Sequence, residues 1–175
     1  MTKSSKVRIQ EDQMKILAEL RKNSSERIDM IAKNCGFSKQ KVSKNINQME
    51  KNHLIWGYTI VDDVQKQNLQ KFILLLKRTD EKFDSNTLDN ISRHLFKEVY
   101  TPIGVIIESS HRIHGDYDWV VIFLAPNLIE AKKFSEILFD KFPGIAKDVN
   151  LMQIIFTNRA NYILNPDQTK LREFL

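Results

Sequence analysis

The sequence predicts an α+β protein built from two domains. Between residues 11 and 52 apolar residues recur at helical spacing, and after residue 70 short strand-like runs alternate with helical segments. The chain has 175 residues, of which 42% are hydrophobic and 28% charged, so it can bury two small cores and is too apolar to be disordered. We expect one domain over 1–61, a polar linker over 62–70, a second domain over 71–158 and a tail over 159–175.

Three short helices are expected in the first domain, each placed by one apolar face. These faces are Ile16, Leu17 and Leu20 for a helix over 12–22, then Ile28, Ile31, Ala32 and Cys35, and finally Val42, Ile46 and Met49. Gly36 ends the second helix, Ser38 caps the third, and Asn52 closes it. The run 54–61 is rich in aromatic and β-branched residues and predicts a strand.

The second domain has the order strand, helix, strand, strand, helix, strand. The strands are expected over 72–77, 103–110, 117–124 and 149–156, and the helices over 85–97 and 127–142. This βαββαβ order predicts a ferredoxin-like domain, in which both helices cover one face of an antiparallel sheet. The other face needs a cover, and a second copy of the chain is the simplest one.

The spacing Ala32-x-x-x-Gly36-x-x-x-x-x-Val42 is the most specific signal. A small residue lets two helices cross closely, a glycine four positions later makes the sharp turn, and the apolar residue returns the third helix to the core. Each residue type has a steric reason at its position. The pattern therefore predicts a helix-turn-helix, and an ordinary helical hairpin is the alternative.

The exposed face of the third helix is polar and cationic and carries no acid before Glu50. A rotation of 100° per residue from Val42 places its amides and lysines away from the core. Amides pair with adenine, and lysines suit guanine or phosphate. Base contacts are expected from Gln40, Ser43, Lys44 and Asn47, and phosphate contacts from Lys39, Lys41 and Lys51, beside the capping Ser38. A merely solvated face is the alternative.

The net charge of +5 supports a nucleic-acid partner for the first domain. Residues 1–68 hold 13 Lys and Arg against 8 Asp and Glu, whereas residues 69–175 hold 14 of each. The five glycines are too far apart for a dinucleotide turn or a phosphate loop. We expect no cofactor and no catalysis.

The sequence also argues against a metal site, a membrane span and a signal peptide. Cys35 is the single cysteine, and His111 and His114 have no evident third partner, so no metal site is expected. The longest apolar runs have strand length, and residues 1–6 have no apolar core, so neither a membrane span nor a signal peptide is expected. A cytoplasmic protein fits these features.

These residues resemble the Lrp/AsnC family of feast/famine regulators over about residues 12–158. In the first domain the resemblance rests on Ile16-Leu17-x-x-Leu20, Ile31-Ala32-x-x-x-Gly36-Phe37-Ser38, Val42-x-x-x-Ile46-x-x-Met49-Glu50 and Ile55-x-Gly57-Tyr58-Thr59. In the second it rests on Gly115-Asp116-Tyr117-Asp118 and Phe142-Pro143-Gly144-Ile145.

The resemblance implies a winged helix-turn-helix, with the strand over 54–61 in its wing, joined to a ferredoxin-like βαββαβ effector domain. It also implies a homodimer or octamer that binds double-stranded DNA as a transcription regulator and takes an amino-acid effector. By resemblance the effector site includes Gly115, Asp116 and Tyr117, although Gly-Asp is also simply a good turn. Two alternatives remain open: a tetrapyrrole decarboxylase-like enzyme on a similar fold, and a small-molecule sensor that binds a protein partner.

Overall fold

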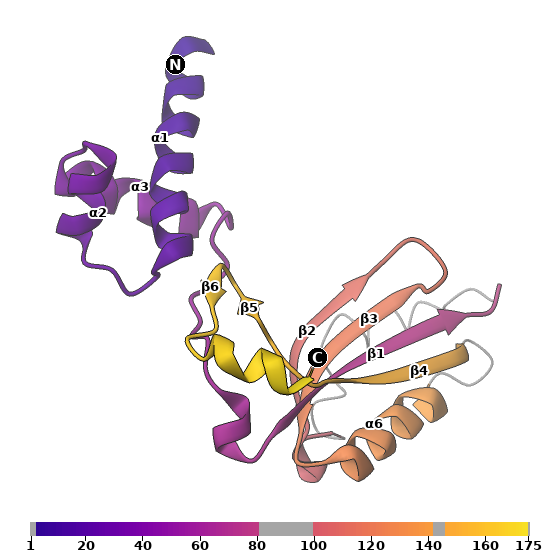
Figure 1. Cartoon of the computed structure of the whole chain (residues 1–175). Helices are drawn as coiled ribbons and strands as arrows, with labels where there is room; N and C mark the ends of the chain where they lie inside the picture. The colour runs from indigo at the N-terminus through magenta and orange to yellow at the C-terminus, as the bar shows by residue number, and fades with distance from the viewer. Residues whose placement is uncertain (1–2, 81–99, 142–145, 175) are drawn as a thin grey trace. The chain divides into compact units, whose positions relative to one another are not determined.

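The computed structural model describes residues 3–80, 100–141 and 146–174 (Figure 1). The chain divides into two compact units. The first combines residues 1–61 with 158–173, and the second combines 62–157 with 174–175. The C-terminal tail therefore contributes to both units.

The first unit is a three-helix bundle of α1 (Lys3–Lys22), α2 (Ile28–Cys35) and α3 (Lys39–Lys51). Its core holds Ile16, Ile31, Val42 and Met49, each at most 1% exposed. The apolar spacing therefore placed all three helices correctly. The start of α1 is a correction, because the helix begins nine residues before the predicted residue 12.

The turn between α2 and α3 depends on Gly36, whose φ of 69° is the left-handed conformation that glycine adopts at low cost. The Gly36 N–H donates to the Lys33 carbonyl at 3.2 Å, and the Phe37 N–H donates to the Ala32 carbonyl at 2.8 Å. This pair of bonds satisfies the last carbonyls of α2. The Ser38 hydroxyl then accepts from the Lys41 N–H at 3.2 Å and caps α3. The helix-turn-helix prediction is confirmed.

The strand predicted over 54–61 is not present: this prediction was wrong. Residues 55–63 have no regular secondary structure, and a short 3-10 helix, η1 (Val64–Gln67), lies within the predicted linker. A strand requires hydrogen bonds from a neighbouring strand. The structure describes no partner strand for this segment within the chain.

The second unit contains an antiparallel sheet of β1 (Gln70–Arg78), β2 (Ile106–Arg112), β3 (Trp119–Ala125) and β4 (Ala146–Ile154). Its order is β2-β3-β1-β4, and α6 (Leu128–Lys141) packs on one face (Figure 1). The strand predicted over 103–110 begins three residues later, because Ile103 ends the 3-10 helix η2 (Thr101–Ile103) and Gly104 and Val105 lie between η2 and β2. The predicted helix 85–97 and the motif at 142–145 lie outside the described residues.

The two faces of the sheet differ in what covers them. Phe72 and Phe123 are fully buried against Phe134 of α6. The opposite face carries Ile73, which is paired across the sheet with Ile122 and Met152. Further apolar residues on this opposite face are Leu75, Val120, Leu124, Ile106 and Ile154. Apart from Leu124, which is buried, these residues are half-buried or exposed.

The tail adds two short strands, β5 (Arg159–Ala160) and β6 (Ile163–Leu164), and a 3-10 helix, η3 (Gln168–Phe174). The strands form an antiparallel hairpin of their own. Except for its last residues, this tail belongs to the helical unit.

Candidate nucleic-acid interface

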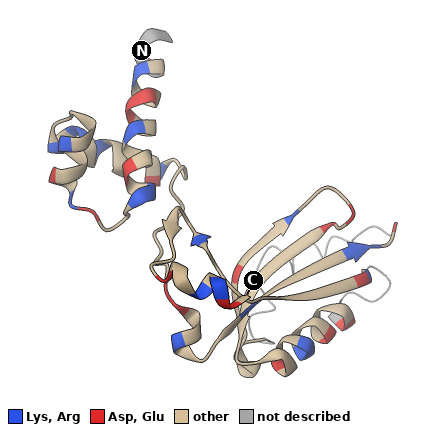
Figure 2. Ribbon diagram, viewed as in Figure 1, with Lys and Arg blue, Asp and Glu red and all other residues tan. Residues whose placement is uncertain are grey.

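The exposed face of α3 consists of the polar and cationic side chains that the sequence singled out. Burial of Val42 and Met49 fixes the rotation of the helix. Ser43 is half-buried at the edge of this face. The exposed members, with the capping serine, are Ser38, Lys39, Gln40, Lys44, Asn47 and Lys51. Figure 2 shows Lys and Arg in blue on the helices of this unit.

Lys41 differs from the other predicted phosphate contacts, because its charge is already engaged within the unit. Its Nζ lies 2.6 Å from Asp12 Oδ2 on α1. The same ammonium lies 3.8 Å from the centroid of the Phe37 ring, which is in the turn before α3. Lys41 thus ties α1, the turn and α3 together. The sequence analysis missed this partnership of Asp12.

Lys39 has a looser acidic neighbour, since its Nζ lies 3.9 Å from Asp29 Oδ2 on α2. Asp29 is held more firmly by Arg27, whose Nε and Nη2 donate to its two carboxylate oxygens at 3.2 and 3.1 Å. Exposed ion pairs of this kind contribute little stability. The Lys39 ammonium is therefore free to exchange its partner for a phosphate.

Asn45 is a polar residue of α3 that the sequence analysis overlooked. It is 9% exposed, and its Nδ2 donates to the Lys41 carbonyl at 2.8 Å. This bond satisfies the buried amide inside its own helix. Its position three residues after Val42 and four before Met49 was the available signal, because both spacings belong to the buried stripe.

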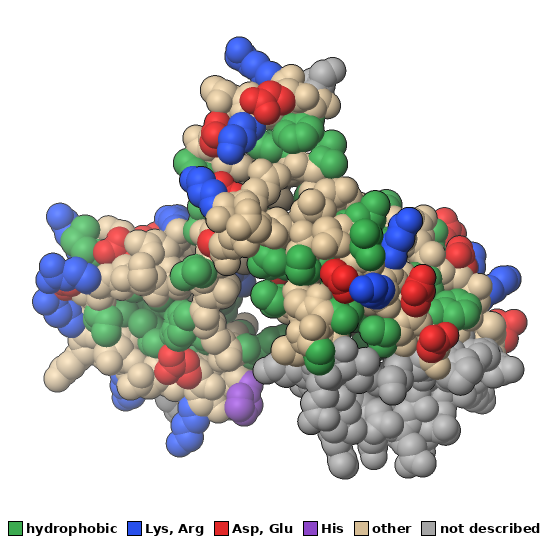
Figure 3. Space-filling view, turned by 90° about the horizontal axis from the view of Figure 1, so that it is seen from below, with side chains coloured by type: hydrophobic (Ala, Val, Ile, Leu, Met, Phe, Trp, Pro, Cys, Tyr) green, Lys and Arg blue, Asp and Glu red, His purple; other side chains and the backbone are tan. Residues whose placement is uncertain are grey.

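The segment after α3 has one hydrogen bond to that helix and a second to the turn that follows it. The Tyr58 hydroxyl donates to Glu50 Oε1 at 2.8 Å, and the Trp56 indole N–H donates to the His53 carbonyl at 2.8 Å. The Trp56 ring is nevertheless 95% exposed, and Ile60 is 78% exposed. Figure 3 shows that hydrophobic side chains (green) reach the surface on the face that it displays.

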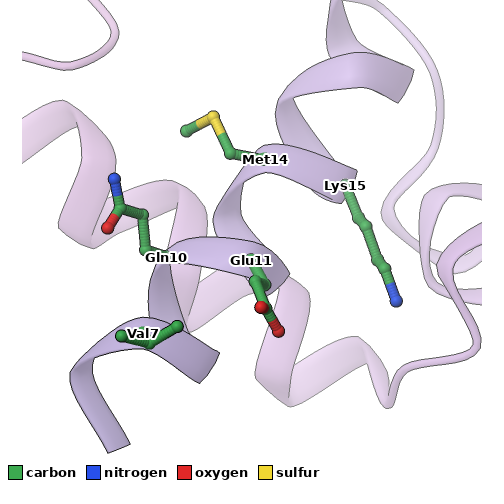
Figure 4. A pocket seen from close by; sticks show the side chains of 5 residues that line it. All are labelled: Val7, Gln10, Glu11, Met14 and Lys15. Atoms are coloured by element: carbon green, nitrogen blue, oxygen red, sulfur yellow. The ribbon is translucent and has the colours of Figure 1, made fainter. Parts of the chain in front are cut away.

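A shallow hollow runs along α1, and Val7, Gln10, Glu11, Met14 and Lys15 line it (Figure 4). All five side chains come from this one helix. A hollow with a single helix as its wall does not surround a small molecule, so we assign it no ligand.

The predicted effector residues lie in the loop between β2 and β3. Gly115 has a φ of +151°, and a side chain there would meet nothing within 4 Å, so the conformation rather than lack of space requires glycine. Asp116 is exposed and Tyr117 is half-buried. The Tyr117 hydroxyl accepts from Asn150 Nδ2 at 3.3 Å. The structure thus places the three residues together at one end of the sheet.

Asp118 anchors this loop, a role that sequence reasoning did not assign. Its carboxylate accepts from the Arg78 N–H at 2.8 Å, and its own N–H donates to the Leu76 carbonyl at 2.9 Å. The Ile113 N–H donates to the Asp118 carbonyl at 2.9 Å and closes the hairpin. The loop is therefore fixed to the end of β1, which leaves Asp116 projecting.

Among the described residues, no three His, Cys, Asp or Glu side chains are grouped as metal ligands. His111 and His114 are both exposed. Within the same residues, every helix is too short or too polar to traverse a bilayer.

The chain resembles known proteins in its structure. No protein-family model and no curated protein matches the chain. An AsnC family transcriptional regulator from Agrobacterium tumefaciens superposes with a TM-score of 0.65 and 20% identity, over 89% of this chain and 96% of that one. LrpC of B. subtilis gives a TM-score of 0.59 and 19% identity, over 83% and 94%. The chain has the Lrp/AsnC fold.

A third structure with the Lrp/AsnC fold carries a ligand. It is a transcriptional regulator from Neisseria meningitidis in complex with L-Met, with a TM-score of 0.64 and 13% identity, over 90% of this chain and 96% of that one. All three comparisons cover more of the other chain than of this one. This chain therefore adds residues to the shared fold.

The hydrogen bond between Tyr58 and Glu50 generates a pH-dependent prediction. Partial burial of the ring and the bond to the Glu50 carboxylate raise the pKa of Tyr58 from 10 to about 12. An ultraviolet titration of the folded protein is expected to show one tyrosine that ionises near pH 12, and Glu50→Gln is expected to lower that pKa.

The stability contributed by this pKa difference is complete below pH 10. It is lost as the pH rises from 10 to about 12, because the unfolded chain releases the proton first. Tyr58→Phe is the control and must lack the late ionisation. An unchanged titration in Glu50→Gln would show that Glu50 has no part in the shift.

Proposed function

We propose that the protein is a sequence-specific DNA-binding transcription regulator of the Lrp/AsnC type, with α3 as its recognition helix. The observation that carries this proposal is the sidedness of α3. Its apolar face is buried against α1 and α2, and its opposite face presents exposed amides and ammonium groups. A helix with these properties, directly after a helix-turn-helix turn, is suited to the major groove.

The proposed contacts divide by chemistry. Gln40 and Asn47 are assigned to base edges, because side-chain amides match the donor and acceptor of adenine. Ser43 and Lys44 are assigned to bases beside them, and Ser38 lies at the end of the helix that enters the groove. Lys39 and Lys51 are assigned to phosphates. Lys41 is assigned to positioning, because Asp12 and Phe37 already hold its ammonium.

The proposed active form is a homodimer or a higher oligomer such as an octamer. The open face of the sheet carries apolar residues from all four strands, including Ile73 and Ile122. A second copy on that face would bury them. The same partner could supply the missing neighbour of segment 54–61. A dimer would present two α3 helices to successive major grooves.

Effector binding is proposed at the loop of Gly115, Asp116 and Tyr117. The neighbouring Neisseria structure holds L-Met, which makes an amino acid the first ligand to test. In this chain the anchored loop leaves the Asp116 carboxylate exposed, where it could pair with an α-ammonium group. Such a ligand would shift DNA occupancy by favouring one arrangement of subunits.

Loss of one phosphate contact tests the DNA-binding proposal. With a mixed-sequence duplex of about 30 base pairs, long enough for two half-sites, the affinity of the protein is expected to fall steeply with salt. Lys51→Gln should weaken binding and reduce the slope of log K against log salt by about 1 per contact removed. Fluorescence anisotropy at several salt concentrations measures both.

The matched control is Lys132→Gln on α6, an exposed lysine of the second unit that should leave the slope unchanged. Absence of duplex binding at low salt would reject the regulator proposal. A salt-independent interaction with a protein would instead favour the sensor alternative.

A charge on the open sheet face tests the oligomer. Ile73→Glu is expected to reduce the molar mass in size-exclusion chromatography with light scattering, because a carboxylate would be buried between subunits. Ile129→Glu is the control, since Ile129 is 66% exposed on α6. A wild-type monomer, or an unchanged mass for Ile73→Glu, would contradict the proposed interface.

A thermal-shift screen of the amino acids tests the effector site. A ligand at about 100 times its Kd stabilises the folded state by roughly 2.7 kcal/mol. Asp116→Asn is expected to abolish the shift, whereas Glu136→Gln on α6 should retain it. If no amino acid raises the Tm, the effector proposal is wrong and the DNA-binding proposal is unaffected.

A further inference from the structure

The ion pair between Asp12 and Lys41 lies at the start of α3. Lys41 is the third residue of this helix, and the N-terminal part of a recognition helix is the part that reaches the bases. A lysine there is well placed to contact the phosphate backbone. In this protein the Lys41 Nζ instead lies 2.6 Å from Asp12 Oδ2 on α1. The pair therefore fixes a negative charge beside one cation of the candidate interface.

Burial strengthens this pair against exchange. The side chain of Asp12 is 15% exposed and that of Lys41 is 36% exposed. Salt screens such partly buried charges less than it screens fully exposed ones. If Lys41 moved to a phosphate, the Asp12 carboxylate would stay partly buried without its partner, which is unfavourable. The pair thus opposes the transfer of Lys41 to DNA.

The neighbouring pair of Lys39 with Asp29 has none of this resistance. The Lys39 Nζ lies 3.9 Å from Asp29 Oδ2, and the Asp29 side chain is 30% exposed. Arg27 donates to both carboxylate oxygens of Asp29, so departure of Lys39 leaves that carboxylate with a partner. The two lysines in the first turn of α3 therefore differ: Lys39 is available to a phosphate, and Lys41 is held by a carboxylate of its own.

We propose that Asp12 is an internal competitor of DNA phosphate for Lys41, and that it limits the sequence-independent part of DNA binding. This inference rests on the proposed DNA-binding function. A phosphate contact adds affinity for every sequence, because the backbone carries no sequence information. By neutralising Lys41 within the bundle, Asp12 removes one such contact and leaves the base contacts assigned to Gln40 and Asn47 unchanged.

Neutral variants of Asp12 in the full chain test this competition. Asp12→Asn and Asp12→Ala free the Lys41 ammonium, and the Phe37 ring beside it is uncharged and does not neutralise it. Alanine also suits the interior of a helix better than aspartate does, so the second variant guards the fold of α1. Circular dichroism shows whether each variant is folded.

Each Asp12 variant is expected to bind the same mixed-sequence duplex more tightly than the wild type does. The slope of log K against log salt should be steeper by about 0.9, the value for one added phosphate contact. The gain in affinity over the wild type should therefore shrink about 3.5-fold as the salt rises from about 50 to 200 mM. Fluorescence anisotropy at several salt concentrations measures both quantities.

The matched control is Glu19→Gln, also on α1. Glu19 pairs with Lys22, a lysine outside α3, so this variant changes the net charge by the same amount without freeing a lysine of the interface. It should keep the wild-type slope. A double variant that combines Asp12→Asn with Lys41→Gln should also return to the wild-type slope, because the freed ammonium is then absent.

The proposal is overturned if the Asp12 variants keep the wild-type slope, or if both fail to fold, because the pair would then serve only the stability of the bundle. It is also overturned if Glu19→Gln steepens the slope equally, or if the double variant keeps the steeper slope. Failure of the DNA-binding proposal itself gives a different result, in which neither the wild type nor any variant binds the duplex at low salt.

Discussion

The rotation of α3 about its own axis is the constraint on which the interface depends. Val42 and Met49 are buried against Ile16 and Ile31, and burial of such side chains stabilises the fold by about 1.5–3 kcal/mol each. A helix that turned to bury Lys44 would lose this energy and desolvate a charge. Exposure of the amides and lysines is therefore a consequence of core packing. Gly36 completes the arrangement by directing α3 out of the turn.

The sequence predicted the helices and strands that are specified by the apolar pattern of their own residues. The apolar period fixed α2, α3 and most of the sheet, because burial on one face leaves a regular pattern. The first turns of α1 carry no such pattern, yet the helix extends there because lengthening an existing helix requires no new nucleus. Segment 54–61 has the composition of a strand, but a ladder also needs a neighbour, which composition does not reveal.

In the candidate site, too, helical periodicity predicts which side chains share a face but not which of them contact other elements. Lys41 and Ser43 lie at equal angles on either side of Val42, so periodicity alone treats both as flanks of one polar face. Only the position of Asp12 on α1 shows that Lys41 is engaged inside the bundle. Likewise, the loop sequence Gly115-Asp116-Tyr117-Asp118 indicated a turn, whereas the anchoring of Asp118 to β1 depends on contacts 40 residues apart in the chain.

Two unrelated features of the single chain support the proposed oligomer. The open sheet face, opposite α6, carries Ile73, Ile122 and Met152, and segment 54–61 carries Trp56, which is 95% exposed. Each would be unfavourable in water. The proposed second copy of the chain would cover both, whereas a small ligand is too small to cover an entire sheet face.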